Sequence, residues 1–161
     1  MIATIILFII SVFLEGLIPN ILRGITPFFV IAIIIIASFN IKNKKWFYII
    51  CFITGIIYDL IYMNTVFLHG FIYLFLAFLA YKILGKKNYF IKALASYFIL
   101  VVTYVFIMIL FTISFKTYTI YHVIHILYDG IVINILYFLL IYITYYVINR
   151  ISGNRLKKST Y

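Results

Sequence analysis

The feature that constrains this chain most is a succession of long apolar runs separated by short polar segments. Most of the runs are close to the roughly 20 residues that a helix needs to cross about 30 Å of hydrocarbon. They lack the alternating pattern of membrane barrel strands. Because 68% of the residues are hydrophobic and only 10% are charged, the chain has too little polar surface to cover a water-soluble core. The sequence therefore predicts an all-α integral membrane protein.

Six runs are apolar enough to be transmembrane helices, and we expect a single domain over residues 1–161 with short loops. The expected helices are 2–18, 27–41, 46–62, 67–84, 93–115 and 126–148. Pro19 is expected to end the first helix and Pro27 to open the second, because proline is tolerated only at such positions. The first run has no basic n-region and no small-residue cleavage site, so we interpret it as a retained helix.

The basic residues predict the orientation of this bundle. All but Arg23 and Lys116 of the 13 Lys and Arg residues lie in or beside the segments after the second and fourth runs, or in the C-terminal tail. The positive-inside rule then gives six spans with both termini in the cytoplasm. These charges form no continuous face, so the net charge of +10 predicts no nucleic-acid partner.

Asp59 is the anomaly of the sequence, because it lies well inside the third apolar run. A carboxylate at such a position costs about 2.5–3.5 kcal/mol on insertion scales, so it normally faces the interior of the bundle. Gly55 precedes it by four residues and shares its helix face. A glycine allows another helix to approach closely. We therefore expect Asp59 to be buried in protein and not in lipid.

The predicted orientation brings the polar residues together on the outer side. Glu15, Asp59 and Asp129 all fall there, and the same side holds Arg23, His69, Lys116, His122 and His125. Three interpretations stay open. The carboxylates could pair with Arg23, Lys116 or a histidine, because an unpaired buried charge is costly. The cluster could line a pocket or a partner-docking groove. If the last helix begins before residue 126, His122, His125 and Asp129 would share one of its faces and could hold a metal.

Structural pairing is the expectation among these, with no resident metal or cofactor. The chain has no glycine-rich phosphate loop, nucleophile elbow, H-E-x-x-H motif or pair of catalytic carboxylates, so we expect a protein that is not an enzyme. The aromatic residues, 21% of the chain, are interpreted as packing residues and interfacial anchors.

Four segments spread over the whole chain carry a resemblance to a known family. They are Thr26-Pro27 before a short apolar run, Trp46 leading into Gly55-x-x-x-Asp59-Leu60, the helix start Leu68-His69-Gly70-Phe71, and the run 131–136 with Asn134. In these features the chain resembles MreD, the small membrane protein of the bacterial rod-shape system. Family members often carry an acidic residue directly after the opening proline, where this chain has Phe28.

The resemblance implies a non-enzymatic subunit of the cell-elongation machinery in the bacterial plasma membrane. Its partners would be MreC, the actin-like MreB, and the RodA and penicillin-binding synthases that build sidewall peptidoglycan. The resemblance also implies that Gly55 and Asp59 are the signature pair of the central hairpin, and that Asn134 is a further family residue.

The alternative is a substrate-binding membrane subunit of a vitamin or metal importer. Such subunits are also small six-helix bundles, with a pocket toward the outer face that the polar cluster could line. They typically dock an energising subunit through small residues along the first helix, where residues 2–13 offer only Ala3 and Ser11. An ion or proton pathway through Asp59 would need polar groups across the whole membrane, and the inner half has no acidic residue.

Overall fold

The computed structural model describes residues 2–21, 27–41, 43–63, 67–84, 90–115 and 120–158, and these ranges contain helices but no β-strand. The all-α prediction is therefore confirmed. In chain order the elements are α1 (Ile2–Ile21), α2 (Phe29–Asn40), α3 (Lys44–Tyr58), the π-helical turn η1 (Asp59–Met63), α4 (Leu68–Leu84), α5 (Phe90–Phe115) and α6 (Ile120–Lys158).

Four of the helices are long and apolar enough to cross a membrane. The apolar stretches are Thr4–Ile21, Lys44–Tyr62, Phe90–Phe111 and Gly130–Ile148. The other two helices are shorter: α2 has 12 residues and α4 has 17. At a rise of about 1.5 Å per residue, α2 is only about 18 Å long. The chain is thus a multi-pass membrane protein, while the count of six spans stays a prediction.

Three predicted helix boundaries are wrong. Pro19 does not end the first helix, because it lies in the last turn of α1, where the missing N–H costs a single hydrogen bond. Pro27 does not open α2, which begins at Phe29 after the non-helical Phe28. The last helix is 39 residues long, because helical backbone continues through the polar residues on both sides of the apolar run. An apolar run reports the membrane-crossing part of a helix and not its whole length.

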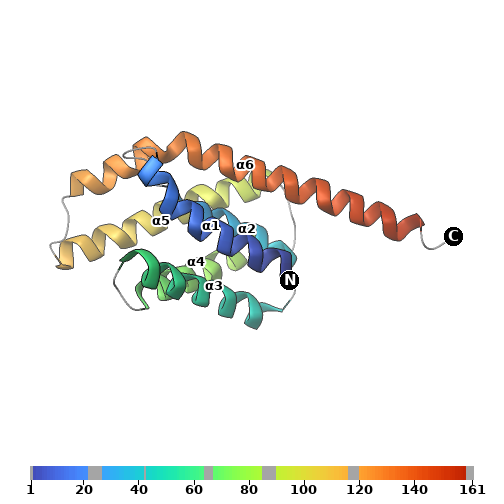
Figure 1. Ribbon diagram of the computed structural model, residues 1–161, viewed down its shortest axis with the longest axis horizontal. Helices are drawn as coiled ribbons and strands as arrows, with labels where there is room; N and C mark the ends of the chain where they lie inside the picture. The colour runs from blue at the N-terminus through green and yellow to red at the C-terminus, as the bar shows by residue number, and fades with distance from the viewer. Residues whose placement is uncertain are drawn as a thin grey trace.

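Helix α2 is the centre of the bundle. Every residue from Phe29 to Ala37 is buried, and the helix contacts α1, α3, α4, α5 and α6. A helix that is apolar on all sides, like Ile33 to Ile36, lies either in lipid or inside a protein core, and here other helices cover it. Figure 1 shows α2 behind α1, with α6 running along the bundle and projecting beyond it toward the C-terminus.

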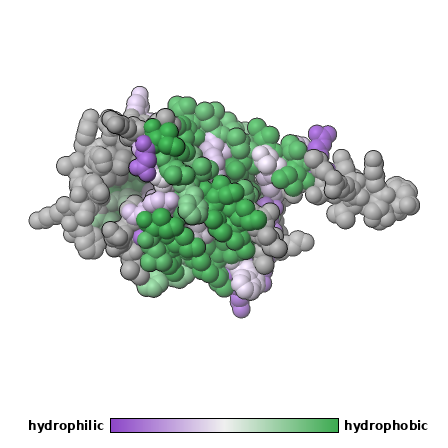
Figure 2. Space-filling model, viewed as in Figure 1, coloured by the Kyte–Doolittle hydropathy of each residue, from purple (hydrophilic) through white to green (hydrophobic). Residues whose placement is uncertain are grey.

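The outer surface of the bundle is itself apolar. Large hydrophobic side chains are exposed on every long helix, for example Phe13 on α1, Ile53 on α3, Phe106 on α5 and Leu140 on α6. In Figure 2 the hydrophobic residues cover the middle of the visible face, and the hydrophilic ones lie toward its two ends. This distribution is the one expected of a surface in contact with lipid.

Candidate functional site

The site begins where α3 and α4 touch. A Cβ atom at Gly55 would lie 2.3 Å from the carbonyl oxygen of His69 and 2.5 Å from the amide nitrogen of Gly70. Only a hydrogen atom fits there, because both neighbours are backbone atoms of α4. One turn later Asp59 is completely buried, with 0% of its surface exposed. The predicted close approach at Gly55 and the predicted burial of Asp59 in protein are therefore confirmed.

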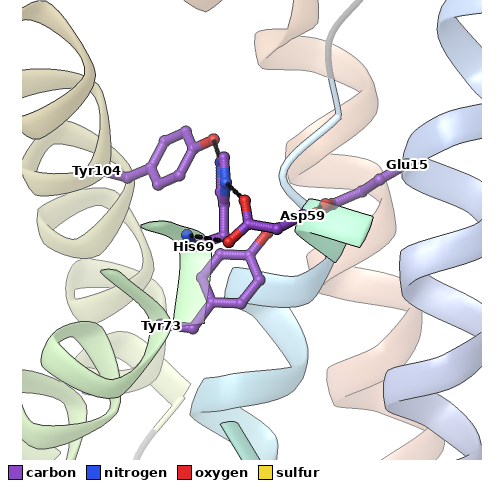
Figure 3. A network of polar contacts seen from close by, with 5 residues as sticks. All are labelled: Glu15, Asp59, His69, Tyr73 and Tyr104. Carbon is purple, nitrogen blue, oxygen red and sulfur yellow. Dashed lines mark hydrogen bonds and ion pairs between the residues drawn. The ribbon is translucent and has the colours of Figure 1, made fainter. Parts of the chain in front are cut away.

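Asp59 is held by His69, and His69 by Tyr104. One carboxylate oxygen of Asp59, Oδ1, lies 2.6 Å from Nδ1 of His69, and the other, Oδ2, accepts a hydrogen bond of 2.8 Å from the His69 backbone N–H. On the far side of the ring, Nε2 lies 3.1 Å from the Tyr104 hydroxyl on α5. Because an ionised carboxylate can only accept, the Asp59 contact uses the Nδ1–H of His69, and Nε2 shares a hydrogen bond with the Tyr104 hydroxyl. Figure 3 shows this chain of contacts.

The same carboxylate caps helix α4. The carbonyl of Phe67 accepts the first helical hydrogen bond, from the Phe71 N–H, which makes Phe67 the N-cap residue. A phenylalanine side chain cannot accept a hydrogen bond from the free N–H groups of a first helical turn. Asp59 supplies the missing acceptor from another helix, at the N–H of His69. Its negative charge also lies at the positive end of the α4 dipole, which is favourable.

Helix α2 is capped in the same way. Its N-cap residue, Phe28, makes no side-chain cap. Instead, the Val30 N–H donates to Oε1 of Glu15 at 2.7 Å, and the Phe28 N–H donates to Oδ1 of Asn134 on α6. Glu15 and Asn134 are both buried. A carboxylate from α1 and an amide from α6 thus hold the start of the central helix.

The two caps meet at α4. Tyr73, which follows His69 by four residues, has its hydroxyl 3.5 Å from Oε2 of Glu15, at the long limit of a hydrogen bond. The Tyr73 ring also packs edge-on against the His69 ring, with centroids 5.8 Å apart. Figure 3 shows Asp59 at the His69 ring and Glu15 on the side of the Tyr73 hydroxyl. We call these five residues, Glu15, Asp59, His69, Tyr73 and Tyr104, the polar core.

The structure joins five of the nine predicted site residues around the starts of α2 and α4: Glu15, Gly55, Asp59, His69 and Asn134. Pairing of a carboxylate with a histidine is confirmed for Asp59. Arg23 lies outside the described residues, and so do the side chains of His122, His125 and Asp129, although their backbone belongs to α6. Within the described ranges no three His, Cys, Asp or Glu residues gather as metal ligands would.

The residues that sequence reasoning missed are Tyr73, Tyr104 and the backbone N–H groups of Phe28 and Val30. Tyr73 could have been found, because its spacing of four residues puts it on the face of His69. The sequence also carried a signal for the two helix caps, because each of the short apolar runs, 27–41 and 67–84, follows a run that has a carboxylate near its end. Tyr104 had none, because nothing in one sequence says which face of α5 meets α4.

The geometry of the polar core is that of a fixed structural centre. Asp59 and His69 have no exposed surface, so a solute reaches them only if helices separate. Both carboxylates accept N–H groups that would otherwise be buried without a partner.

Comparison with known proteins gives no independent assignment: no protein-family model, curated protein or solved structure matches this chain.

Proposed function

We propose that this chain is a non-enzymatic scaffold subunit of the bacterial cell-elongation complex, in the plasma membrane. Its partners in this proposal are an MreC-like membrane protein, MreB, RodA and a penicillin-binding synthase. The basis is the resemblance to MreD in the segments around residues 26–27, 46–60, 68–71 and 131–136.

The observation that carries the proposal is the structural role of those same residues. Gly55 sets the distance between α3 and α4, Asp59 caps α4 through His69, and Asn134 holds the Phe28 N–H at the start of α2. A resemblance limited to scattered apolar residues would be expected between any two membrane helices. Here three of the resembling residues, Gly55, Asp59 and Asn134, position helices, which supports a shared bundle.

The polar core also favours a scaffold over a substrate-binding importer subunit. An importer pocket needs polar groups that are free to meet a vitamin or a metal. In the described part of the chain, Glu15 and Asp59 already accept hydrogen bonds from the first turns of α2 and α4. Binding a solute there would require both helix starts to lose their caps.

Co-purification tests the proposal directly. The protein is tagged at its C-terminus and purified in mild detergent from the cells that encode it, and the co-eluting proteins and small molecules are identified by mass spectrometry. We expect an MreC-like protein. Recovery of an ATPase pair with a coupling membrane subunit, or of a tightly held vitamin or metal, would make the chain an importer subunit and refute the scaffold.

The Asp59→Ala variant extends this test to the polar core. We expect it to insert into the membrane but to recover less of the MreC-like partner, because the α3–α4 hairpin loses its cap. Recovery is compared at equal amounts of folded protein, which the protection of the single buried Cys51 from a thiol reagent reports. Wild-type recovery and cell elongation with this variant would exclude a functional role for Asp59.

A further inference from the structure

A second surface lies on the outside of the α3–α4 hairpin, on the face of α4 that is turned away from the polar core. Three phenylalanines of α4, Phe71, Phe75 and Phe78, follow one another at spacings of four and three residues and are between 47% and 63% exposed. This spacing places them in one row along the helix. Together with Leu74 and with Tyr48 of α3, they line a hollow of about 400 Å³, which we call the aromatic groove.

One end of the aromatic groove is basic. The Lys44 ammonium reaches from α3 to α4 and lies 4.4 Å from the centre of the Tyr81 ring. Lys44 precedes Tyr48 of the groove by four residues, and Lys82 follows Phe78 of the groove by four residues. Each lysine therefore shares a helix face with one wall of the groove. Both lysines are exposed, so an anion can approach them.

The described part of the chain offers these two lysines no carboxylate. The chain has only three Asp and Glu residues, and the one ion pair among the described residues joins Asp59 to His69. Asp59 lies at the opposite end of α3, about 22 Å from Lys44 along the helix axis. A lysine ammonium has three N–H donors, so the contact with Tyr81 leaves donors for an anion. The negative charge must come from outside the chain.

The length of the aromatic groove matches one leaflet of the bilayer. Trp46 is 52% exposed beside Lys44, and exposed tryptophans of membrane proteins mark the headgroup level. From Lys82 to Phe71, α4 rises by about 16 Å, close to the roughly 15 Å of hydrocarbon in one leaflet. An acyl chain in the groove would therefore place its headgroup at the two lysines. The positive-inside rule predicts that this leaflet is the inner one.

We propose that the α3–α4 hairpin binds an anionic glycerophospholipid from the inner leaflet. One acyl chain lies in the aromatic groove, and the phosphate accepts hydrogen bonds from Lys44 and Lys82. Choline and ethanolamine headgroups carry a cation of their own, which the lysines repel, so the site selects lipids with a net negative charge. The site does not depend on the scaffold function, because it uses neither the polar core nor a protein partner.

Photo-crosslinking tests the site in the full-length protein in lipid nanodiscs. The probe is a phosphatidylglycerol with a diazirine and an alkyne on one acyl chain, and a phosphatidylcholine with the same chains is the control. Labelled peptides are identified by mass spectrometry. We expect the anionic probe to label the segment Phe71–Phe78 more strongly than the control lipid does. Equal labelling of this segment by the two probes, or the same preference on every lipid-facing helix, would overturn the proposal.

Lysine variants test the headgroup contact. Lys44→Gln and Lys82→Gln should each lower the ratio of anionic to control labelling in this segment about fivefold, the effect of one lysine near an anionic headgroup. Arg150→Gln is the matched control, because Arg150 is an exposed basic residue of α6 just beyond the stretch Gly130–Ile148 and outside the groove. It should leave the ratio unchanged. An unchanged ratio with both lysine variants, or an equal loss with Arg150→Gln, would refute the assignment.

A second pair of variants tests the contact with the acyl chain. Leu74→Trp fills the aromatic groove and should reduce labelling of the segment Phe71–Phe78 by the anionic probe severalfold. Phe106→Trp, at an exposed position of α5 outside the groove, should leave this labelling unchanged. Protection of the buried Cys51 thiol confirms that each variant is folded. Full labelling of folded Leu74→Trp would show that the acyl chain does not lie in the groove.

Discussion

Replacement of Gly55 by alanine tests whether the contact between α3 and α4 holds the polar core together. The added methyl group would lie 2.3 Å from the carbonyl oxygen of His69, and an ordinary contact needs about 3.4 Å. Neither atom is at the end of a flexible side chain, so α4 must move away from α3 by about 1 Å. That movement displaces His69, the residue that Asp59 holds.

The cost of Gly55→Ala follows from this movement. A shift of about 1 Å along the Asp59–His69 contacts stretches hydrogen bonds of 2.6 and 2.8 Å beyond the useful range. Each such bond between membrane helices contributes about 0.6–1.7 kcal/mol, and overpacking adds about 1–3 kcal/mol. We expect Gly55→Ala to reduce the free energy of unfolding by about 2–6 kcal/mol.

Gly70→Ala is the matched control on the same interface. Its methyl group would meet side-chain atoms of Ile56 and Phe52 at 3.2 Å, and these can shift by a few tenths of an ångström. Both substitutions gain the same preference of alanine for helix, about 0.5–1 kcal/mol, so that gain cancels in the comparison. We expect Gly70→Ala to have a stability close to that of the wild type.

The buried thiol of Cys51 provides the assay, because it is the only cysteine and lies on α3. The rate of maleimide labelling is measured in detergent as denaturant is added, and the midpoint gives the relative stability. Gly55→Ala should label at lower denaturant than Gly70→Ala and the wild type. If the two variants label alike, the close approach at Gly55 does not position α4 and the reasoning fails.

Three further predictions concern the helix caps, and each is checked by the same Cys51 labelling midpoint. Tyr104→Phe keeps the ring but leaves Nε2 of His69 without its hydrogen-bond partner, so it should cost about 0.6–1.7 kcal/mol. Glu15→Ala removes the acceptor of the Val30 N–H and should cost about 1–2 kcal/mol, whereas Glu15→Gln keeps a carbonyl oxygen there and should cost less. Asn134→Leu strands the Phe28 N–H and should cost about 1–3 kcal/mol, whereas Asn134→Asp retains an acceptor and should cost less. Equal effects within either matched pair would show that the acceptor oxygen is not what matters.

Much of the fold could be predicted from the sequence, because few kinds of structure are stable in lipid. The length and composition of the apolar runs predict membrane helices, and the cost of a carboxylate in hydrocarbon predicts that Asp59 is buried in protein. Gly55, one turn away, indicates the helix face that meets a neighbour. These inferences use local spacing and transfer free energies, which a single sequence contains.

The arrangement of the helices was not readable in the same way. All six apolar runs look alike in composition, so nothing in the run 27–41 marks α2 as the central helix apart from its short length. The pairing of His69 with Tyr104 joins residues 35 positions apart, and a single sequence does not show which residues of α4 and α5 face each other. Helix ends were misjudged at Pro19 and in α6 because polar residues continue a helix beyond its apolar stretch.

The two short helices and the two buried carboxylates have one explanation. Phe28 and Phe67 are the N-cap residues of α2 and α4, and neither side chain can accept a hydrogen bond. In each case a carboxylate near the end of the preceding long helix accepts the N–H two residues after the cap, from Val30 or His69.

A helix that starts among apolar residues must have its free N–H groups satisfied by protein, because lipid offers no acceptor. Glu15 and Asp59 meet that need, so the starts of both short helices, α2 and α4, can lie inside the bundle. The polar residues that first appear functional in the sequence are therefore used to build the bundle. The outer surfaces of α1, α3, α4, α5 and α6 carry the large exposed apolar side chains that face lipid.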